Sequence, residues 1–298
     1  MTLTQSWALF AEWWAMSLTM AFGSFVAGST PAGGGAVAFP VFTKVLDVNA
    51  SEARTFGLMI QSVGMGMASV YILMRRIPVY RKVIVCVVPG GIVGMTLGAL
   101  FLHLPFPYPR ISFTCMVAMF GAAYHISHWL LKHEPDFDGH RWESHSPRHF
   151  MLAGFIGGIL TSQCGSGIDM VSFIVMTLAY GMHEKKAIPT SVIIMTILSL
   201  YGFFWFGVVE GSIAAEWNYW AVCVPVVALG APLGAWFVSR VGRKWILTAL
   251  SLLILTDLLS TIMMIDLSAQ AGMLVVLLLF VSGAAFAAML RWRHREVN

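Results

Sequence analysis

Long apolar segments alternate with short polar connections along almost the whole chain. Several segments are continuously apolar and reach the roughly 20 residues that an α-helix needs to cross a bilayer, whereas membrane strands alternate in polarity. The pattern therefore predicts an all-α polytopic membrane protein. The segments cover residues 7–29, 35–46, 55–74, 83–102, 111–131, 150–163, 167–181, 187–209, 218–239, 245–264 and 270–290.

Composition supports this class, because 58% of the residues are hydrophobic and only 11% are charged. Soluble domains carry about 25% charged residues. The net charge of +4 is spread over the connections between apolar segments, so it does not indicate a nucleic-acid partner. Four cysteines lie in apolar segments without the C-x-x-C spacing of a metal or redox site.

Two related glycine patterns occur in the first and second halves of the chain. Residues 89–99 are PGGIVGMTLGA and residues 225–235 are PVVALGAPLGA, so one proline, two glycines and one alanine match at a constant offset. Upstream of each, a glycine-rich tripeptide interrupts an apolar stretch, at Gly33–Gly35 and at Gly165–Gly167. Repeated halves with interrupted helices are typical of secondary transporters, in which the breaks mark the substrate site.

The lysines and arginines indicate how the halves are oriented. All of them except Lys44, Arg54 and Arg110 fall on one side when each long segment crosses the membrane, and the positive-inside rule makes that side cytoplasmic. Loop 75–82 is strongly basic, whereas residues 210–217, which occupy the matching place in the second half, carry only acidic charges. Matching loops thus face opposite sides, which predicts inverted topology and a cytoplasmic C-terminus.

The predicted fold is two inverted-topology repeats. The first membrane repeat covers residues 1–131, a polar cytoplasmic linker covers 132–149, and the second membrane repeat covers 150–298. Each repeat consists of a glycine-broken hairpin, re-entrant or two-span, followed by three transmembrane helices. The hairpin of about 10–47 opens to the outside and that of about 150–182 opens to the cytoplasm.

The two breaks are predicted to form one anion site. Glycine and proline runs cannot continue a helix, and broken backbone at membrane depth persists only beside protein or a water-filled cavity. The helix that begins after each break directs free N–H groups at that cavity, which suits an oxyanion. Tight helix packing is the alternative, and it fits the glycines of the two repeated motifs better. The candidate binding residues in the breaks are Thr30, Gly33, Gly34, Gly35, Ser162, Gln163, Cys164, Gly165, Ser166 and Gly167.

Three polar residues at membrane depth are further candidates. Asp169 and Asp257 could carry a coupling proton, because ionisable groups inside a membrane are usually functional. The alternatives are a helix cap for Asp169 and a hydrogen-bonded structural carboxyl for Asp257, with partners such as Ser251, Ser260 or Thr261. Gln61 could face the first break or form an interhelical hydrogen bond.

The chain resembles the sulfite exporter and toluene-sulfonate uptake permease family of the TauE/SafE type. The resemblance rests on a glycine break early in each half, the A-x-x-T-S of Ala187–Ser191 and the P-x4-G-x3-G-A helix in each half, and it covers about 15–290. It implies a secondary carrier, in a bacterial-type cell membrane, for sulfite, sulfoacetate or related organosulfonates. It also implies that Thr190 and Ser191 belong to the substrate site. The chain departs from the pattern at Phe56, where the second half has Thr190.

Other functional classes have less support. No G-x-x-x-x-G-K-[ST] motif occurs, which excludes direct ATP drive within this chain. An anion channel on the same scaffold is the main alternative, and a membrane enzyme lacks a His/Asp/Ser cluster. We expect no cofactor and no metal site, since the histidines between 125 and 149 fit a polar linker. The expected partners are a small anion and the lipid bilayer, and a homodimer is compatible with the sequence.

Overall fold

The computed structural model describes residues 3–31, 33, 42, 48–102, 104–105, 107–129, 146–213, 216–264 and 269–295. This part of the chain is helical and contains no strand. Two π-helical turns, η2 (Val175–Ala179) and η3 (Trp205–Val209), continue α7 and α8. The helices are α1 (Leu3–Ser29), α3 (Ala50–Met74), α4 (Arg81–Phe101), α5 (Tyr108–Trp129), α6 (Ser146–Cys164), α7 (Ile168–Ile174), α8 (Glu184–Phe204), α9 (Glu216–Arg240), α10 (Arg243–Met264) and α11 (Ala269–Arg295).

These helices coincide with the apolar segments of the sequence, which confirms the all-α class. Segment 35–46 lies outside the described residues except for Phe42. Most of the predicted linker 132–149 also lies outside them, and its last residues, from Ser146 on, belong to α6. Among the described residues, five helical stretches are long and apolar enough to cross a membrane. They are Ser51–Met74, Arg81–Phe101, Glu184–Val209, Glu216–Arg240 and Gly272–Arg291.

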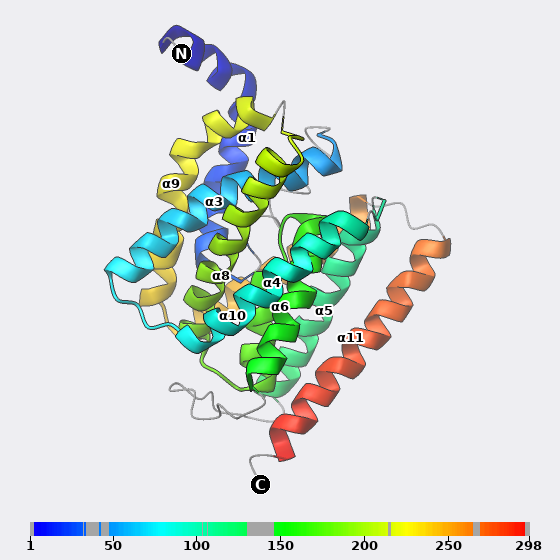
Figure 1. The fold of residues 1–298 in the computed structure, drawn as a ribbon. Helices are drawn as coiled ribbons and strands as arrows, with labels where there is room; N and C mark the ends of the chain where they lie inside the picture. The colour runs from blue at the N-terminus through cyan, green and yellow to red at the C-terminus, as the bar shows by residue number, and fades with distance from the viewer. Residues whose placement is uncertain are drawn as a thin grey trace.

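The last of these stretches lies on the outside of the bundle. In Figure 1, α11 runs along one edge, where it packs mainly against α5. Large apolar side chains such as Met273, Val276 and Phe280 are exposed on it. Exposed apolar area on this scale is expected where lipid is the solvent. The protein is therefore a multi-pass membrane protein.

The closest helix pairs join the two halves of the chain. Helix α1 packs along α9, and α4 packs along α6, so each pair combines the helix before a glycine break with the Pro/Gly helix of the other half. Helix α3 contacts both α8 and α9. The N- and C-termini lie at opposite ends of this bundle, as Figure 1 shows.

Glycines of the repeated motifs allow this close approach. A β-carbon on Gly94 of α4 would overlap the carbonyl oxygen of Phe155 in α6. In the same way, a β-carbon on Gly234 of α9 would overlap the carbonyl oxygen of Phe25 in α1. Backbone therefore contacts backbone at both crossings, as small residues permit in membrane helices. The packing interpretation of these glycines is confirmed.

We expect Gly94→Ala to destabilise the protein by about 1–3 kcal/mol, which is typical of an added methyl group that a packed interior cannot accommodate. The matched control is Gly66→Ala in α3, where a β-carbon would lie 4.0 Å from the Thr196 Cγ2 atom, an ordinary contact. Thermal unfolding in detergent measures both variants. Equal melting temperatures for the two would contradict the packing role.

Candidate functional site

The two glycine breaks meet inside the bundle. Gly33 has a φ of +65°, a conformation that favours glycine. A β-carbon at this position would lie 2.8 Å from Asp169 Oδ2, 2.9 Å from Ser166 Oγ and 3.2 Å from Gln61 Oε1. The first break thus lies directly against the second, and Gln61 of α3 completes the contact. Gly34 and Gly35 lie outside the described residues.

The second break is a short, internally bonded turn between α6 and α7. Gly165 has a φ of +73°, and its N–H donates to Thr161 O at 2.9 Å. The Thr161 hydroxyl oxygen accepts from Ile168 N at 3.0 Å. A β-carbon on Gly165 would lie 2.7 Å from the carbonyl oxygen of Arg54, so α3 packs against the turn. Local hydrogen bonds and this contact hold the broken backbone in one conformation.

Asp169 follows the turn and is 0% exposed. Its Oδ1 atom accepts hydrogen bonds from Gly167 N at 3.2 Å, Met170 N at 3.0 Å and Ser166 Oγ at 3.4 Å. These bonds match the helix-cap alternative for this residue. The other carboxylate oxygen, Oδ2, is buried and has no hydrogen-bond partner among the residues that the structure describes. Capping therefore accounts for only one of the two carboxylate oxygens.

Gln61 faces the same break from α3 and is 4% exposed. Its Nε2 amide donates to Gly165 O at 2.9 Å and to Gly57 O at 3.0 Å. The side chain thus lies between the two breaks, because its amide group bonds to Gly165 and its Oε1 atom lies 3.2 Å from the position of a β-carbon on Gly33. Its Oε1 atom is buried without a hydrogen-bond partner.

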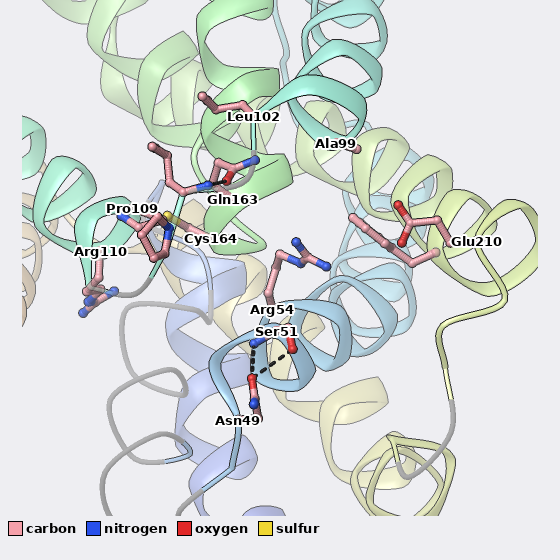
Figure 2. A pocket seen from close by; sticks show the side chains of 13 residues that line it. Asn49, Ser51, Arg54, Ala99, Leu102, Pro109, Arg110, Gln163, Cys164 and Glu210 are labelled. Carbon is pink, nitrogen blue, oxygen red and sulfur yellow. Dashed lines mark hydrogen bonds between the residues drawn. The ribbon is translucent and has the colours of Figure 1, made fainter.

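A cavity of about 420 Å³ lies on the other side of the second break. Figure 2 shows the Arg54 side chain extending into it from α3, with Gln163 and Cys164 on one side and Glu210 on another. The cavity combines polar and apolar walls from both halves of the chain. Its lining residues are Asn49, Ser51, Arg54, Ala99, Leu102, Leu104, Pro105, Pro109, Arg110, Gln163, Cys164, Phe206 and Glu210.

Arg54 is the cationic group that projects into the cavity. Its guanidinium carbon lies 4.3 Å from the ring centroid of Phe206, which belongs to the π-helical turn η3. Its Nη1 atom donates to Ser162 O at 3.4 Å, whereas its Nε atom has no partner. Within the described ranges, no carboxylate forms an ion pair with it. Glu210, which lines the same cavity, interacts with Arg54 electrostatically but forms no ion pair with it, so the N–H donors of Arg54 remain accessible to an anion.

Arg110 also lines the cavity, but its charge is neutralised. Its Nη2 atom forms an ion pair with Asp257 Oδ1, and Thr114 Oγ1 donates to Asp257 Oδ2 at 2.8 Å. Arg110 is 6% exposed and Asp257 is 1% exposed. In Figure 2 the Arg110 guanidinium is directed away from the cavity. The Asp257 carboxylate thus matches the alternative of a hydrogen-bonded structural carboxyl. Its side-chain partners are Arg110 and Thr114, whereas the sequence suggested Ser251, Ser260 or Thr261.

Other predicted site residues around the breaks hold the local structure. Thr30 Oγ1 donates to Val26 O at 3.0 Å, and Ser162 Oγ donates to Ile159 O at 2.7 Å. Gln163 spans from the second break to α4, where its Nε2 atom donates to Gly98 O at 3.0 Å. Of this set, Gln163 and Cys164 line the cavity.

Thr190 and Ser191 lie in the second turn of α8, apart from both the break and the cavity lining. Thr190 Oγ1 accepts from Tyr80 N at 2.9 Å and donates to Lys186 O at 2.6 Å. Ser191 Oγ donates to Ile188 O at 2.9 Å. The structure thus connects Thr190 to the turn before α4.

Arg54 and Arg110, which both line the cavity, were not predicted from the sequence. One signal could have identified them, since they are two of the three basic residues that the positive-inside rule leaves unexplained. Basic residues on the non-cytoplasmic side of a polytopic chain are candidates for anion contact. Their positions are too far apart in sequence for any motif to connect them.

Comparison with known proteins gives one family. The family model described as sulfite exporter TauE/SafE matches residues 16–264, which is most of the chain. No curated protein and no solved structure gives a significant match. The matched range includes both breaks, Gln61, Asp169 and every residue that lines the cavity.

Proposed function

The chain belongs to the sulfite exporter TauE/SafE family, and on this premise we propose that it is a secondary transporter of a small sulfur-containing anion. Sulfite, sulfoacetate and related organosulfonates are the candidate substrates. The observation that carries the proposal is Arg54, which forms no ion pair among the described residues and projects into a cavity that the second glycine break helps to line.

The chemistry of the cavity fits such an anion. A guanidinium presents several N–H donors in a plane, which matches two oxygens of a sulfite or sulfonate group. Gln163 and Ser51 add neutral polar groups, while Phe206 and Leu102 supply apolar wall beside them. Because these walls lower the local dielectric, one unpaired cation there attracts an anion more strongly than it would in water.

Transport is proposed to occur by alternating access between two inverted repeats, residues 1–131 and 150–298. The reciprocal pairing of α1 with α9 and of α4 with α6 supports this proposal, because it is the pattern that a two-fold relation between repeats produces. In this arrangement the breaks form the centre, the linker and the C-terminus are cytoplasmic, and lipid covers α11. The membrane is a cell membrane of bacterial type.

Inversion predicts opposite accessibility for two loops. We expect single cysteines at Arg76 and Ser212, in a chain without native cysteines, to react with an impermeant maleimide from opposite sides of the membrane. Right-side-out and inside-out vesicles give the two arms of the measurement. Labelling of both positions from the same side would exclude the inverted arrangement.

Flux through proteoliposomes tests the function itself. We expect saturable counterflow of sulfite, sulfoacetate or thiosulfate and little counterflow of a simple carboxylate. Conduction that does not saturate would favour an anion channel on the same scaffold. Transport of the carboxylate but of none of the sulfur anions would contradict the proposed substrate class.

Coupling to a proton is part of the proposal, and we place it at Asp169. The salt bridge and the Thr114 hydrogen bond give both oxygens of Asp257 a partner. Asp169 keeps one buried oxygen without a partner, at the point where the breaks meet. An ionisable group in that position can change its state without breaking an existing ion pair.

A further inference from the structure

Two buried oxygen atoms without partners converge beside Gly33. They are Asp169 Oδ2 and Gln61 Oε1. A β-carbon on Gly33 would lie 2.8 Å from the first, 3.2 Å from the second and 2.9 Å from Ser166 Oγ, so the three oxygens surround one position. We propose that Gln61, Ser166 and Asp169 hold a monovalent coupling cation, a proton or Na⁺, between the two breaks. The inference rests on the proposed function for its role in coupling, and on geometry alone for the site.

The charge of the ligand follows from the atoms that surround this position beside Gly33. A carboxylate oxygen and an amide oxygen are hydrogen-bond acceptors, so they repel an anion and attract a cation or a proton. Burying both without a partner costs free energy, because each has lost its water without replacement. One cation between them satisfies both oxygens and neutralises the carboxylate.

The orientation of Gln61 is determined chemically. Its Nε2 group donates to two carbonyl oxygens, Gly165 O and Gly57 O, which use both of its N–H bonds. A flipped amide would place its oxygen against the same two carbonyls and leave no donor for either. The amide oxygen of Gln61 must therefore face Gly33 and Asp169.

Within the described ranges, no basic side chain competes for this position. Asp169 accepts only from backbone N–H groups and Ser166, and no lysine, arginine or histidine in the described part of the chain pairs with it. Arg54 contacts Ser162 O and Phe206 instead. Among the described residues, no other charged or titratable side chain on α3, α6 or α8, or after η2, forms a hydrogen bond or an ion pair with Asp169. These side chains are Glu52 and Tyr71 on α3, Arg148, His149 and Cys164 on α6, Tyr180 after η2, and Glu184, Lys185, Lys186 and Tyr201 on α8.

The cation site and the anion cavity lie on two sides of one turn. Cys164 lines the cavity that contains Arg54, while the next residue, Gly165, accepts the hydrogen bond from Gln61. Gly165 also packs against the backbone of Arg54. A cation that ties Gln61 to Asp169 therefore stabilises the turn to which the anion site is attached. This gives a direct physical route for coupling between the two ligands.

Two variants and one control test the site in proteoliposomes. Asp169→Asn removes the charge, and Gln61→Ala removes one oxygen ligand. Glu52→Gln, the control, makes the same acid-to-amide change at the start of α3. We expect an imposed proton or sodium gradient to accelerate anion uptake by wild type and by Glu52→Gln. Asp169→Asn should lose this acceleration when its uptake is compared with its own counterflow, and Gln61→Ala should require an about tenfold higher cation concentration.

Measurements of cation binding to the purified protein distinguish a proton from sodium and do not depend on anion transport. A proton at the site gives an infrared carboxyl band that changes with pH and is absent from Asp169→Asn. Sodium at the site gives binding of radioactive sodium that Asp169→Asn abolishes and Gln61→Ala weakens. If wild type carries no sulfur anion but shows one of these signals, the proposed function fails and the cation site stands.

The proposal is overturned if neither signal depends on Asp169. It is also overturned if Asp169→Asn responds to both gradients as wild type does. Should Asp169→Asn fail to fold, Gln61→Ala decides the outcome, because unchanged cation dependence in that variant excludes Gln61 as a ligand.

Discussion

Replacement of Arg54 by alanine is expected to weaken anion transport about ten- to a hundredfold. Hydrogen bonds to a charged group contribute about 1.5–3 kcal/mol, and each 1.4 kcal/mol corresponds to a factor of ten in affinity. The effect should be large at this position because Arg110, the other arginine of the cavity, is already paired with Asp257. The concentration of sulfite or sulfoacetate that half-saturates counterflow measures the change.

Two controls sharpen this test. Arg81→Ala removes an exposed arginine at the start of α4, so flux should stay at the wild-type level. Arg54→Lys keeps the charge but loses the planar set of donors, and it should fall between wild type and Arg54→Ala. Wild-type saturation in Arg54→Ala would show that the anion does not bind in this cavity.

Asp257→Asn is expected to destabilise the protein by about 3–5 kcal/mol, because it leaves the buried Arg110 charge without its counter-ion. Arg110 and Asp257 lie on α5 and α10, so their ion pair joins two helices that also pack together. Chemical unfolding in detergent measures the loss. The effect should be much larger than that of Gly94→Ala.

The matched control replaces both partners together. Arg110→Met combined with Asp257→Leu removes both charges, and it should recover most of the stability that Asp257→Asn loses. Stability of Asp257→Asn equal to that of wild type would contradict a structural role for the pair. Loss of gradient-dependent transport in Asp257→Asn without loss of stability would instead assign coupling to Asp257.

The helices and the breaks were predictable because they depend on local properties of the chain. Continuous apolar runs predicted segments such as 55–74 and 187–209, and the structure has helices at Ala50–Met74 and Glu184–Phe204. Glycine between two apolar runs predicted the turn after Cys164, where α6 ends and α7 begins. The exact ends of the helices were not predicted, because helices such as α3 and α8 begin several residues before the apolar run, in polar sequence.

The site was predicted only in part. Glycine patterns identified Gly33 and Ser166 as candidates, and the structure brings them together with Gln61 and Asp169. The same patterns could not show that acceptor oxygens face this point, nor that no basic side chain of the described residues does so. Thr190, which the family resemblance predicts in the site, accepts a hydrogen bond from the backbone of Tyr80, and its role in the site stays a prediction.

By itself, the sequence determined the membrane class, the helical segments and the positions of the breaks, because hydropathy and helix propensity act over neighbouring residues. Only the tertiary structure decided which buried polar atoms have partners. Arg54 contacts the second break and Arg110 contacts Asp257, and the partners in each pair are separated by more than a third of the sequence. These contacts form only when the helices that carry them pack together. At membrane depth the pairing of each polar atom sets its free energy. An arginine outside any ion pair and two buried oxygens without donors, as judged among the described residues, therefore became visible only in the folded chain.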